Sequence, residues 1–156
     1  MGLTRNQDHL LHLLAVEARK MNEAGRILSG IIGELSACKI LNMTWEPRTG
    51  YDAVDQEGKR IEIKTRRDSK NGKVNPNGTM GFFKKVKENT HSPKRKYVIS
   101  YGLYVELDKN FKAERIIKIS LEKIKQLEKH VKSNGQIRVG RIINAGQPIP
   151  LRNKTT

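Results

Sequence analysis

The hydrophobic pattern of the chain changes from a helical to an extended period around WEPRTG, residues 45–50. Before this point, Thr4 and Gln7 have the spacing of a capping box, which predicts a first helix to about residue 22. A second helix is predicted over 26–41, where apolar residues recur every three or four positions. Beyond WEPRTG, apolar and polar residues alternate as they do in strands. Helices and strands within one short chain predict an α/β fold.

Strands are predicted wherever extended apolar segments lie between turn residues. The predicted strands are 51–54, 59–66, 97–107, 113–119 and 137–143. The first two form a β-hairpin with QEG as its turn, and Ser120 can cap a helix after the fourth. At 156 residues the chain is long enough for one core and too short for two. We therefore predict a single domain over 1–156, with its core at about 26–132.

The second predicted helix carries a carboxylate within its apolar stripe. The stripe consists of Ile27, Ile31, Glu34, Cys38 and Leu41, and the small residues beside it are Gly30, Gly33 and Ala37. The small residues allow another backbone to come close. A buried carboxylate costs free energy unless it is paired, neutralised or bound to a metal. Glu34 is therefore a candidate site residue; the alternative is a side chain at the edge of the stripe that reaches solvent or an arginine.

Residues 68–96 are rich in Gly, Asn, Pro and Lys and show little periodicity. The segment is too long for a simple connection, so we predict a mobile basic excursion that becomes ordered on nucleic acid. Cations in and just before it can meet phosphates. The predicted nucleic-acid-binding residues are Arg66, Arg67, Lys70, Lys73, Lys84, Lys85, Lys94, Arg95 and Lys96. For Phe82 and Phe83, packing onto the core is favoured over stacking on bases.

The net charge of +15 is unevenly distributed along the chain. Residues 1–56 carry 6 Lys and Arg against 7 Asp and Glu, whereas residues 57–156 carry 25 against 9. A positive field of this kind attracts polyanions and speeds their encounter. Nucleic acid is therefore the predicted partner, with DNA ahead of RNA. The alternatives are a generally basic protein and one that binds anionic lipid or acidic protein surfaces.

Several features of the chain exclude other classes of protein. No stretch approaches the roughly 20 apolar residues of a membrane span, and the N-terminus shows no secretory signal. The lone Cys38 permits no internal disulfide. We therefore expect a soluble intracellular protein, in the cytoplasm or associated with the nucleoid, with no membrane partner.

Two acids and an amine are predicted to share one face of the hairpin. Alternation places Glu62 and Lys64 on the same face, and the antiparallel partner strand can bring Asp52 across to it. Two carboxylates suit a divalent metal, and a lysine beside them can orient water or help to deprotonate it. An acid two residues before a lysine also occurs at Glu57 and at Asp68. The alternative is therefore an exposed face decorated with salt bridges.

The order of these features resembles the PD-(D/E)xK nuclease superfamily. The resemblance rests on a helix with Glu34, a strand with Asp52 and a strand with EIK at 62–64, followed by an apolar strand and a helix. It covers about 26–132. This superfamily includes type II restriction endonucleases and archaeal Holliday junction resolvases. The resemblance implies a restriction endonuclease-like domain with a mixed central β-sheet flanked by helices.

The resemblance also implies a function and a role for each residue. Asp52 and Glu62 would bind Mg²⁺, or Mn²⁺ in its place, Lys64 would be the catalytic lysine, and Glu34 would be the helix acid of many members. The activity implied is that of a DNA endonuclease of the restriction or the repair and recombination type, acting as a homodimer. The proline that precedes the first acid in the motif is Tyr51 here. Asp55 is a rival ligand, although it is predicted to lie on the opposite face.

The alternative to this enzyme is a basic nucleic-acid-binding protein of the same fold, whose acids bind no metal.

Overall fold

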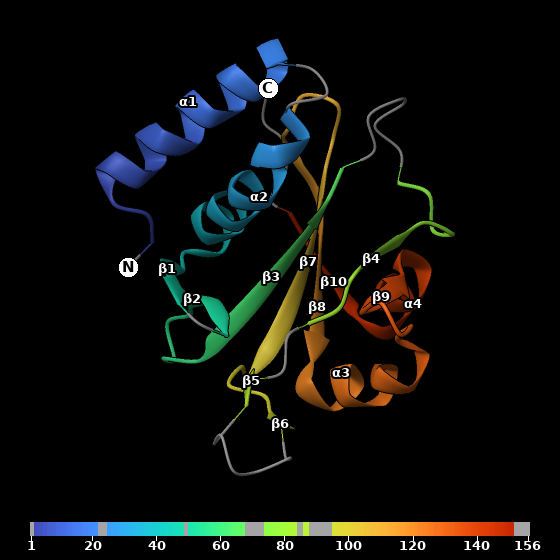
Figure 1. The fold of residues 1–156 in the computed structure, drawn as a ribbon. Coiled ribbons are helices and arrows are strands. Elements are labelled where there is room, and N and C mark those ends of the chain that lie inside the picture. Colours follow the sequence, from blue (N-terminus) through green and yellow to red (C-terminus); the bar gives the residue numbers. More distant parts are fainter. Residues whose placement is uncertain are drawn as a thin grey trace.

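The computed structural model describes residues 2–21, 25–48, 50–67, 74–83, 86–87 and 95–151. Six strands form one mixed sheet in the order β1-β2-β3-β7-β8-β10 (Figure 1). Their bounds are β1 Thr44–Arg48, β2 Tyr51–Val54, β3 Arg60–Arg66, β7 Tyr101–Leu107, β8 Ala113–Ser120 and β10 Gln147–Ile149. Strands β3 and β7 are parallel, and every other neighbouring pair in this sheet is antiparallel.

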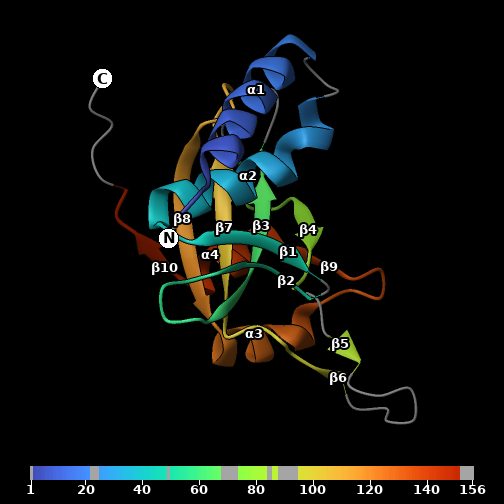
Figure 2. The same ribbon diagram turned by 90° about the vertical axis from the view of Figure 1, so that its left-hand side faces the viewer.

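Helices cover both faces of the sheet. The helices are α1 Arg5–Met21, α2 Gly25–Leu41, α3 Leu121–Leu127 and α4 Val139–Ala145, and the 3₁₀ turn η2 Glu128–His130 follows α3. The first two lie on one face, and α3 and α4 lie on the other (Figures 1 and 2). The chain is thus a single α/β domain, as predicted. None of the helices within the described ranges combines the length and the hydropathy that a bilayer crossing requires.

Alternation along the central strands produces two separate cores. In β7, Leu103 and Val105 belong to the core beneath α2, whereas Tyr104 belongs to the core beneath α3 and α4. In β8, Ile116 faces the first core and Ile117 the second. A strand covered on both faces is mostly apolar, and β7 is buried along almost its whole length.

Two predicted helix starts are confirmed by their side-chain hydrogen bonds. The Thr4 N–H donates to Oε1 of Gln7 at 3.0 Å, and the Gln7 N–H donates to Oγ1 of Thr4 at 3.2 Å. This reciprocal pair is a capping box. Before α3, Oγ of Ser120 accepts from the N–H of Lys123 at 3.2 Å. Both helices therefore begin where the capping residues place them.

The prediction of an edge strand over 137–143 is wrong. Within this segment only the first residues are extended, in β9 Gln136–Arg138, and the rest forms α4. Strand β9 pairs with β4, Thr79–Gly81, outside the main sheet. Val139 and Ile142 are three positions apart and both buried in the second core, a spacing that suits one face of a helix. Residues 137–143 fit both the period of a strand and the period of a helix, so their hydrophobic pattern does not distinguish the two structures. Strands β1 and β10 were not predicted.

Part of the predicted excursion 68–96 is packed onto the domain. Strand β4 belongs to it, and Met80 and Phe83 are buried in the second core. The packing predicted for the two phenylalanines is confirmed for Phe83, and Phe82 packs against the same core. Strands β5, Val86–Lys87, and β6, Arg95–Lys96, pair with each other. Outside the described residues lie Lys70, Lys73, Lys84, Lys85 and Lys94. For those positions, mobility and nucleic-acid binding stay predictions.

Helix α2 contacts β3 at Gly33, and the predicted apolar stripe is only partly buried. Ile31 is 40% exposed, whereas Ile32 is fully buried, so the buried face is rotated by about one residue. A Cβ added at Gly33 would lie 2.7 Å from Cβ of Thr65, closer than real Cβ contacts. The helix therefore rests directly on β3 at this glycine, as the stripe of small residues predicts.

We expect Gly33→Ala to lower the free energy of unfolding by about 1–3 kcal/mol, because α2 must move away from β3 to admit the methyl group. Urea denaturation monitored by circular dichroism measures this change. Gly30→Ala is the matched control: a Cβ there meets nothing within 4 Å. It should be neutral, or stabilising by up to about 1 kcal/mol through helix propensity. Equal effects of the two substitutions would contradict the close approach at Gly33.

Candidate active site

The carboxylate of Asp52 is held against β3 at the point where β2 stops pairing with it. Backbone pairs join Ala53 to Ile61 and Val54 to Arg60. The same register would set Asp52 opposite Glu62, yet no backbone pair is formed there. Instead, Oδ2 of Asp52 accepts a hydrogen bond from the N–H of Ile63 at 2.8 Å. The side chain thus replaces the missing strand partner, which fixes the position of the carboxylate.

Glu62 and Lys64 form a nearly buried pair on β3. Nζ of Lys64 lies 2.9 Å from Oε1 of Glu62, and the two side chains are 20% and 6% exposed. Their neighbour Ile63 points to the first core. The prediction that Glu62 and Lys64 share one face is therefore confirmed. An ion pair this far from water differs from the solvated surface pair that was the alternative.

An aromatic ring helps to exclude water from Glu62. The residue paired with Glu62 on β7 is Gly102. Phe83 packs directly over this glycine, since a Cβ there would lie 2.7 Å from Cζ of the ring. Only glycine leaves room for the ring at this position. Phe83 thereby anchors part of the basic excursion on the residue that pairs with Glu62.

Glu34 reaches the neighbourhood of these groups from α2. Its Oε2 accepts a hydrogen bond from Nε1 of Trp45 at 2.9 Å. Burial raises the pKa of Glu34 to about 7, against the lowering effect of the Trp45 hydrogen bond. The negative charges of Asp52 and Glu62 raise this pKa further, and Lys64 lowers it. Glu34 therefore changes protonation near neutral pH and is electrostatically coupled to all three predicted catalytic groups.

Trp45 is a site residue that the sequence pattern did not indicate. It does pack against the first core, but its indole N–H also binds Glu34. A buried indole N–H requires an acceptor, and a carboxylate in an apolar stripe requires a donor. Both requirements can be seen in the sequence, and together they indicate a hydrogen bond between Trp45 and Glu34.

The described residues contain no group of three or more His, Cys, Asp and Glu side chains arranged to hold a metal ion. Glu34 is thus a neighbour of the carboxylate pair rather than a third ligand. Mg²⁺ commonly binds proteins through one or two carboxylates and completes its coordination with water and phosphate. Asp52 and Glu62 fit such a site. We expect no larger protein cage around the ion.

Cys38 is excluded as a nucleophile. Its side chain is fully buried. Burial raises the pKa of the thiol to about 12, and the negative charges of Glu34 and Asp52 add to this effect. Since only the thiolate is reactive, a thiol with this pKa is inert at neutral pH.

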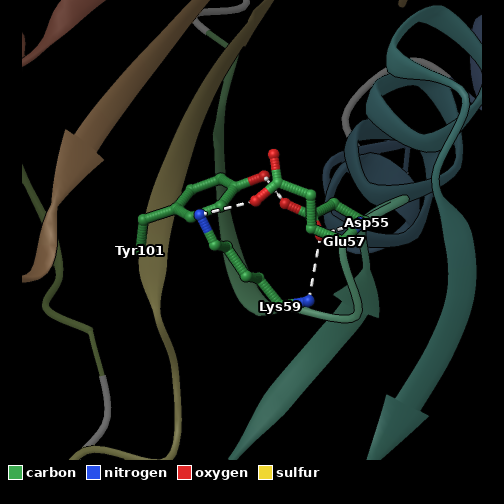
Figure 3. A network of polar contacts seen from close by, with 4 residues as sticks. All are labelled: Asp55, Glu57, Lys59 and Tyr101. Atoms are coloured by element: carbon green, nitrogen blue, oxygen red, sulfur yellow. Dashed lines mark hydrogen bonds and ion pairs between the residues drawn. The ribbon is translucent and has the colours of Figure 1, made fainter.

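Asp55, the rival ligand, belongs to the turn of the hairpin (Figure 3). Its Oδ1 accepts from the N–H groups of Glu57 and Lys59, both at 2.9 Å, and its Oδ2 accepts from the Tyr101 hydroxyl at 2.9 Å. Burial acts to raise the pKa of Asp55, but these hydrogen bonds outweigh it and lower the pKa. The carboxylate therefore stabilises the turn rather than a metal ion.

Arg66 and Arg67, two predicted phosphate ligands, have protein partners. Nη1 of Arg66 donates to the carbonyl of Thr79 at 2.7 Å, which attaches β4 to β3. Arg67 donates to the carbonyls of Asp108 and Lys109 at 3.3 and 2.9 Å. Both arginines hold neighbouring segments in place, and their contact with nucleic acid stays a prediction. The backbones of Arg95 and Lys96 form β6.

Tyr97 is a second residue that the sequence analysis missed. Its hydroxyl donates to Oε1 of Glu128, on η2, at 2.7 Å. Burial raises the pKa of Tyr97, and so do the hydrogen bond to Glu128 and the negative charge of Glu62. Tyr97 therefore contacts η2 and lies within electrostatic range of Glu62. Nothing in the sequence pattern marks it, because its position depends on the tertiary fold.

No model of a known protein family matches the chain, and no curated protein matches it.

We expect Glu34→Gln to change how stability depends on pH. Between about pH 4.5 and pH 7 the unfolded chain ionises Glu34 while the folded protein keeps the proton, so the wild type loses stability as pH rises. Glutamine does not ionise, so the stability of the variant does not fall with pH for this reason. Its stability relative to wild type should therefore rise by about 1–2 kcal/mol across this range, after allowance for partial exposure of the site.

Urea denaturation at pH 5, 6, 7 and 8, in EDTA so that no metal is bound, measures this difference. A difference between the two proteins that stays constant with pH would contradict the raised pKa.

Proposed function

We propose that the chain is a Mg²⁺-dependent DNA endonuclease with a restriction endonuclease-like fold, of the restriction or the repair and recombination type. The observation that carries the proposal is the hydrogen bond from the Ile63 N–H to Oδ2 of Asp52, which holds this carboxylate against β3 next to the Glu62–Lys64 pair. The mixed sheet with helices on both faces supports it. So does the net charge of +15, since a nuclease must approach a polyanion.

The chemistry of the donor set fits a magnesium ion. Asp52 and Glu62 offer carboxylate oxygens, the ligands that hard cations prefer, and among the described residues no His or Cys joins them in a cluster of three or more. A bound Mg²⁺ would polarise the scissile phosphate and lower the pKa of a coordinated water. Mn²⁺ can take its place, because it accepts the same oxygen ligands.

Each side chain then has a definite task. Asp52 is oriented by the Ile63 N–H, so its carboxylate needs no rearrangement before binding. Glu62 holds Lys64 in place through their ion pair. The Lys64 ammonium can stabilise the negative charge that builds up on the phosphate oxygens and can orient the attacking water.

Glu34 supplies a proton-transfer group at neutral pH. With its pKa raised to about 7, it is present in both protonation states there. Its protonated form limits the negative charge gathered around Asp52 and Glu62. Its ionised form can accept a proton from the reaction. Its hydrogen bond to Trp45 fixes the position of the carboxyl group.

A second function, non-catalytic nucleic-acid binding, is favoured by one specific observation. Glu62 and Lys64 already neutralise each other, as they would in a purely structural ion pair. In such a protein the basic charge would serve binding alone. The two functions differ in whether DNA is cut when Mg²⁺ is present.

We expect Asp52→Asn and Lys64→Ala each to lower the rate of DNA cleavage by at least about 100-fold, because each removes a group that acts on the reacting phosphate. The assay uses plasmid and branched DNA with Mg²⁺ or Mn²⁺. Circular dichroism melting checks that both variants are folded.

Lys59→Ala is the matched control. Lys59 forms the same kind of acid-x-lysine pair, with Nζ 2.8 Å from Oε2 of Glu57, but in the exposed turn of the same hairpin. Its loss should leave cleavage within about 3-fold of wild type, as expected for a surface pair. Binding of DNA by the wild type without any cleavage, or cleavage that survives both substitutions at the site, would contradict the nuclease proposal.

A further inference from the structure

The α3–α4 unit presents a cluster of exposed cations. We name it the α3–α4 cationic surface, and it consists of Lys125, Lys129, Lys132, Arg138 and Arg141. Residues 121–145 contain six Lys and Arg but only two acids, Glu122 and Glu128. Helices α3 and α4 pack against each other, which brings the two ends of this segment together. The excess charge is therefore concentrated on one part of the molecule.

Among the described residues, these five cations form no ion pair with an acid, unlike many other cations of the chain. Elsewhere, ion pairs engage Lys20, Lys39, Arg48, Lys59, Lys64 and Arg115. Within the described ranges, none of the five takes part in such a pair. The charge of this surface is therefore available to an external anion. Its lysines and arginines can bind that anion without first breaking an ion pair within the protein.

Two of these cations, Lys129 and Arg141, lie near the same histidine. Burial lowers the pKa of His130, and the positive charges of Arg141 on α4 and Lys129 on η2 lower it further. Cations from two different elements therefore converge on one histidine. Arg138 and Arg141 are three positions apart at the start of α4, so they lie on neighbouring turns.

Tyr97 lies near both η2 and the candidate active site. Its hydroxyl donates to Glu128 on η2 at 2.7 Å, and the negative charge of Glu62 contributes to its raised pKa. Glu62 points away from the face covered by α2, because its neighbours Ile61 and Ile63 occupy that core. The carboxylate pair and α3 are therefore on the same side of the sheet. A polyanion that enters the site can extend over η2 and α4.

The composition of the surface favours a phosphate backbone over a lipid membrane. Proteins that bind anionic membranes usually combine basic residues with apolar side chains that insert into the bilayer. The exposed large apolar residues of the described ranges are Leu10, Leu13, Met21, Ile31 and Ile40. All of them belong to α1 and α2, on the opposite face of the sheet. The α3–α4 cationic surface contains none.

We propose that the α3–α4 cationic surface binds the sugar-phosphate backbone of duplex DNA next to the phosphate that the candidate active site would cut. The identity of this DNA as a substrate rests on the proposed function, whereas the binding itself does not. The contact is to phosphates and carries no sequence preference of its own. It holds the duplex at a fixed distance from Asp52 and Glu62, on the α3 side of the site.

The test uses a triple variant, Lys129→Gln, Arg138→Gln and Arg141→Gln, and a control with equal loss of charge. The control is Arg5→Gln, Lys109→Gln and Lys112→Gln, three exposed cations on α1 and in the β7–β8 turn. Fluorescence anisotropy measures the binding of a 20-base-pair duplex in EDTA from 50 to 300 mM salt, and melting curves check that both variants are folded.

We expect the surface variant to weaken binding at 150 mM salt by at least about 10-fold and to reduce the slope of log K against log salt by about 2–3. The control should change the affinity by less than about 3-fold. Equal weakening in both variants would show that only net charge matters, and it would overturn the proposal. So would unchanged binding by the surface variant. Loss of binding to phosphatidylserine vesicles, with duplex binding retained, would assign the surface to a membrane instead and also overturn it.

Cleavage assays with Mg²⁺ keep this proposal separate from the nuclease proposal. A wild type that binds through the surface but never cuts DNA supports the surface and contradicts the nuclease. A wild type that cuts DNA while the surface variant binds and cuts normally supports the nuclease and overturns the surface.

Discussion

The hydrogen bond from the Ile63 N–H to Asp52 is the interaction on which the candidate site depends. Strand β2 pairs with β3 through two residues, Ala53 and Val54. At the next position, the side chain of Asp52 accepts the hydrogen bond from β3 that a strand backbone would otherwise accept. A carboxylate used in this way cannot turn to the other face without leaving a buried N–H unsatisfied. The backbone of β3 therefore holds Asp52 beside Glu62, and the charged group is positioned by the fold rather than by another charge.

Burial then determines how the charges near this carboxylate behave. Glu62 is 5% exposed and is neutralised by Lys64, whereas Glu34 has no cation within hydrogen-bond distance among the described residues. Its proton is therefore retained up to a pKa of about 7. A group of three ionised carboxylates would be costly here without a cation. The free protein and a metal-bound protein should thus differ in the protonation of Glu34.

Local patterns predicted the parts of the fold that depend on neighbours in sequence. The caps at Thr4 and Ser120, the α/β class and the shared face of Glu62 and Lys64 follow from spacing alone. Spacing failed where tertiary packing decides between alternatives. Residues 139–145 form a helix, and α2 buries Ile32 instead of Ile31. The partners of the site, Trp45 and Tyr97, come from distant segments. Periodicity holds no information about which distant segments meet.

Diffraction from crystals soaked in Mn²⁺ tests the central claim most directly, because the ion has an anomalous signal that locates it without ambiguity. We predict an anomalous peak within coordination distance of both Asp52 and Glu62, with the Lys64 amine beside it and Oδ2 of Asp52 still bound to the Ile63 N–H. A structure in which the two carboxylates face opposite sides of the sheet, or in which the ion binds only elsewhere, would contradict the account.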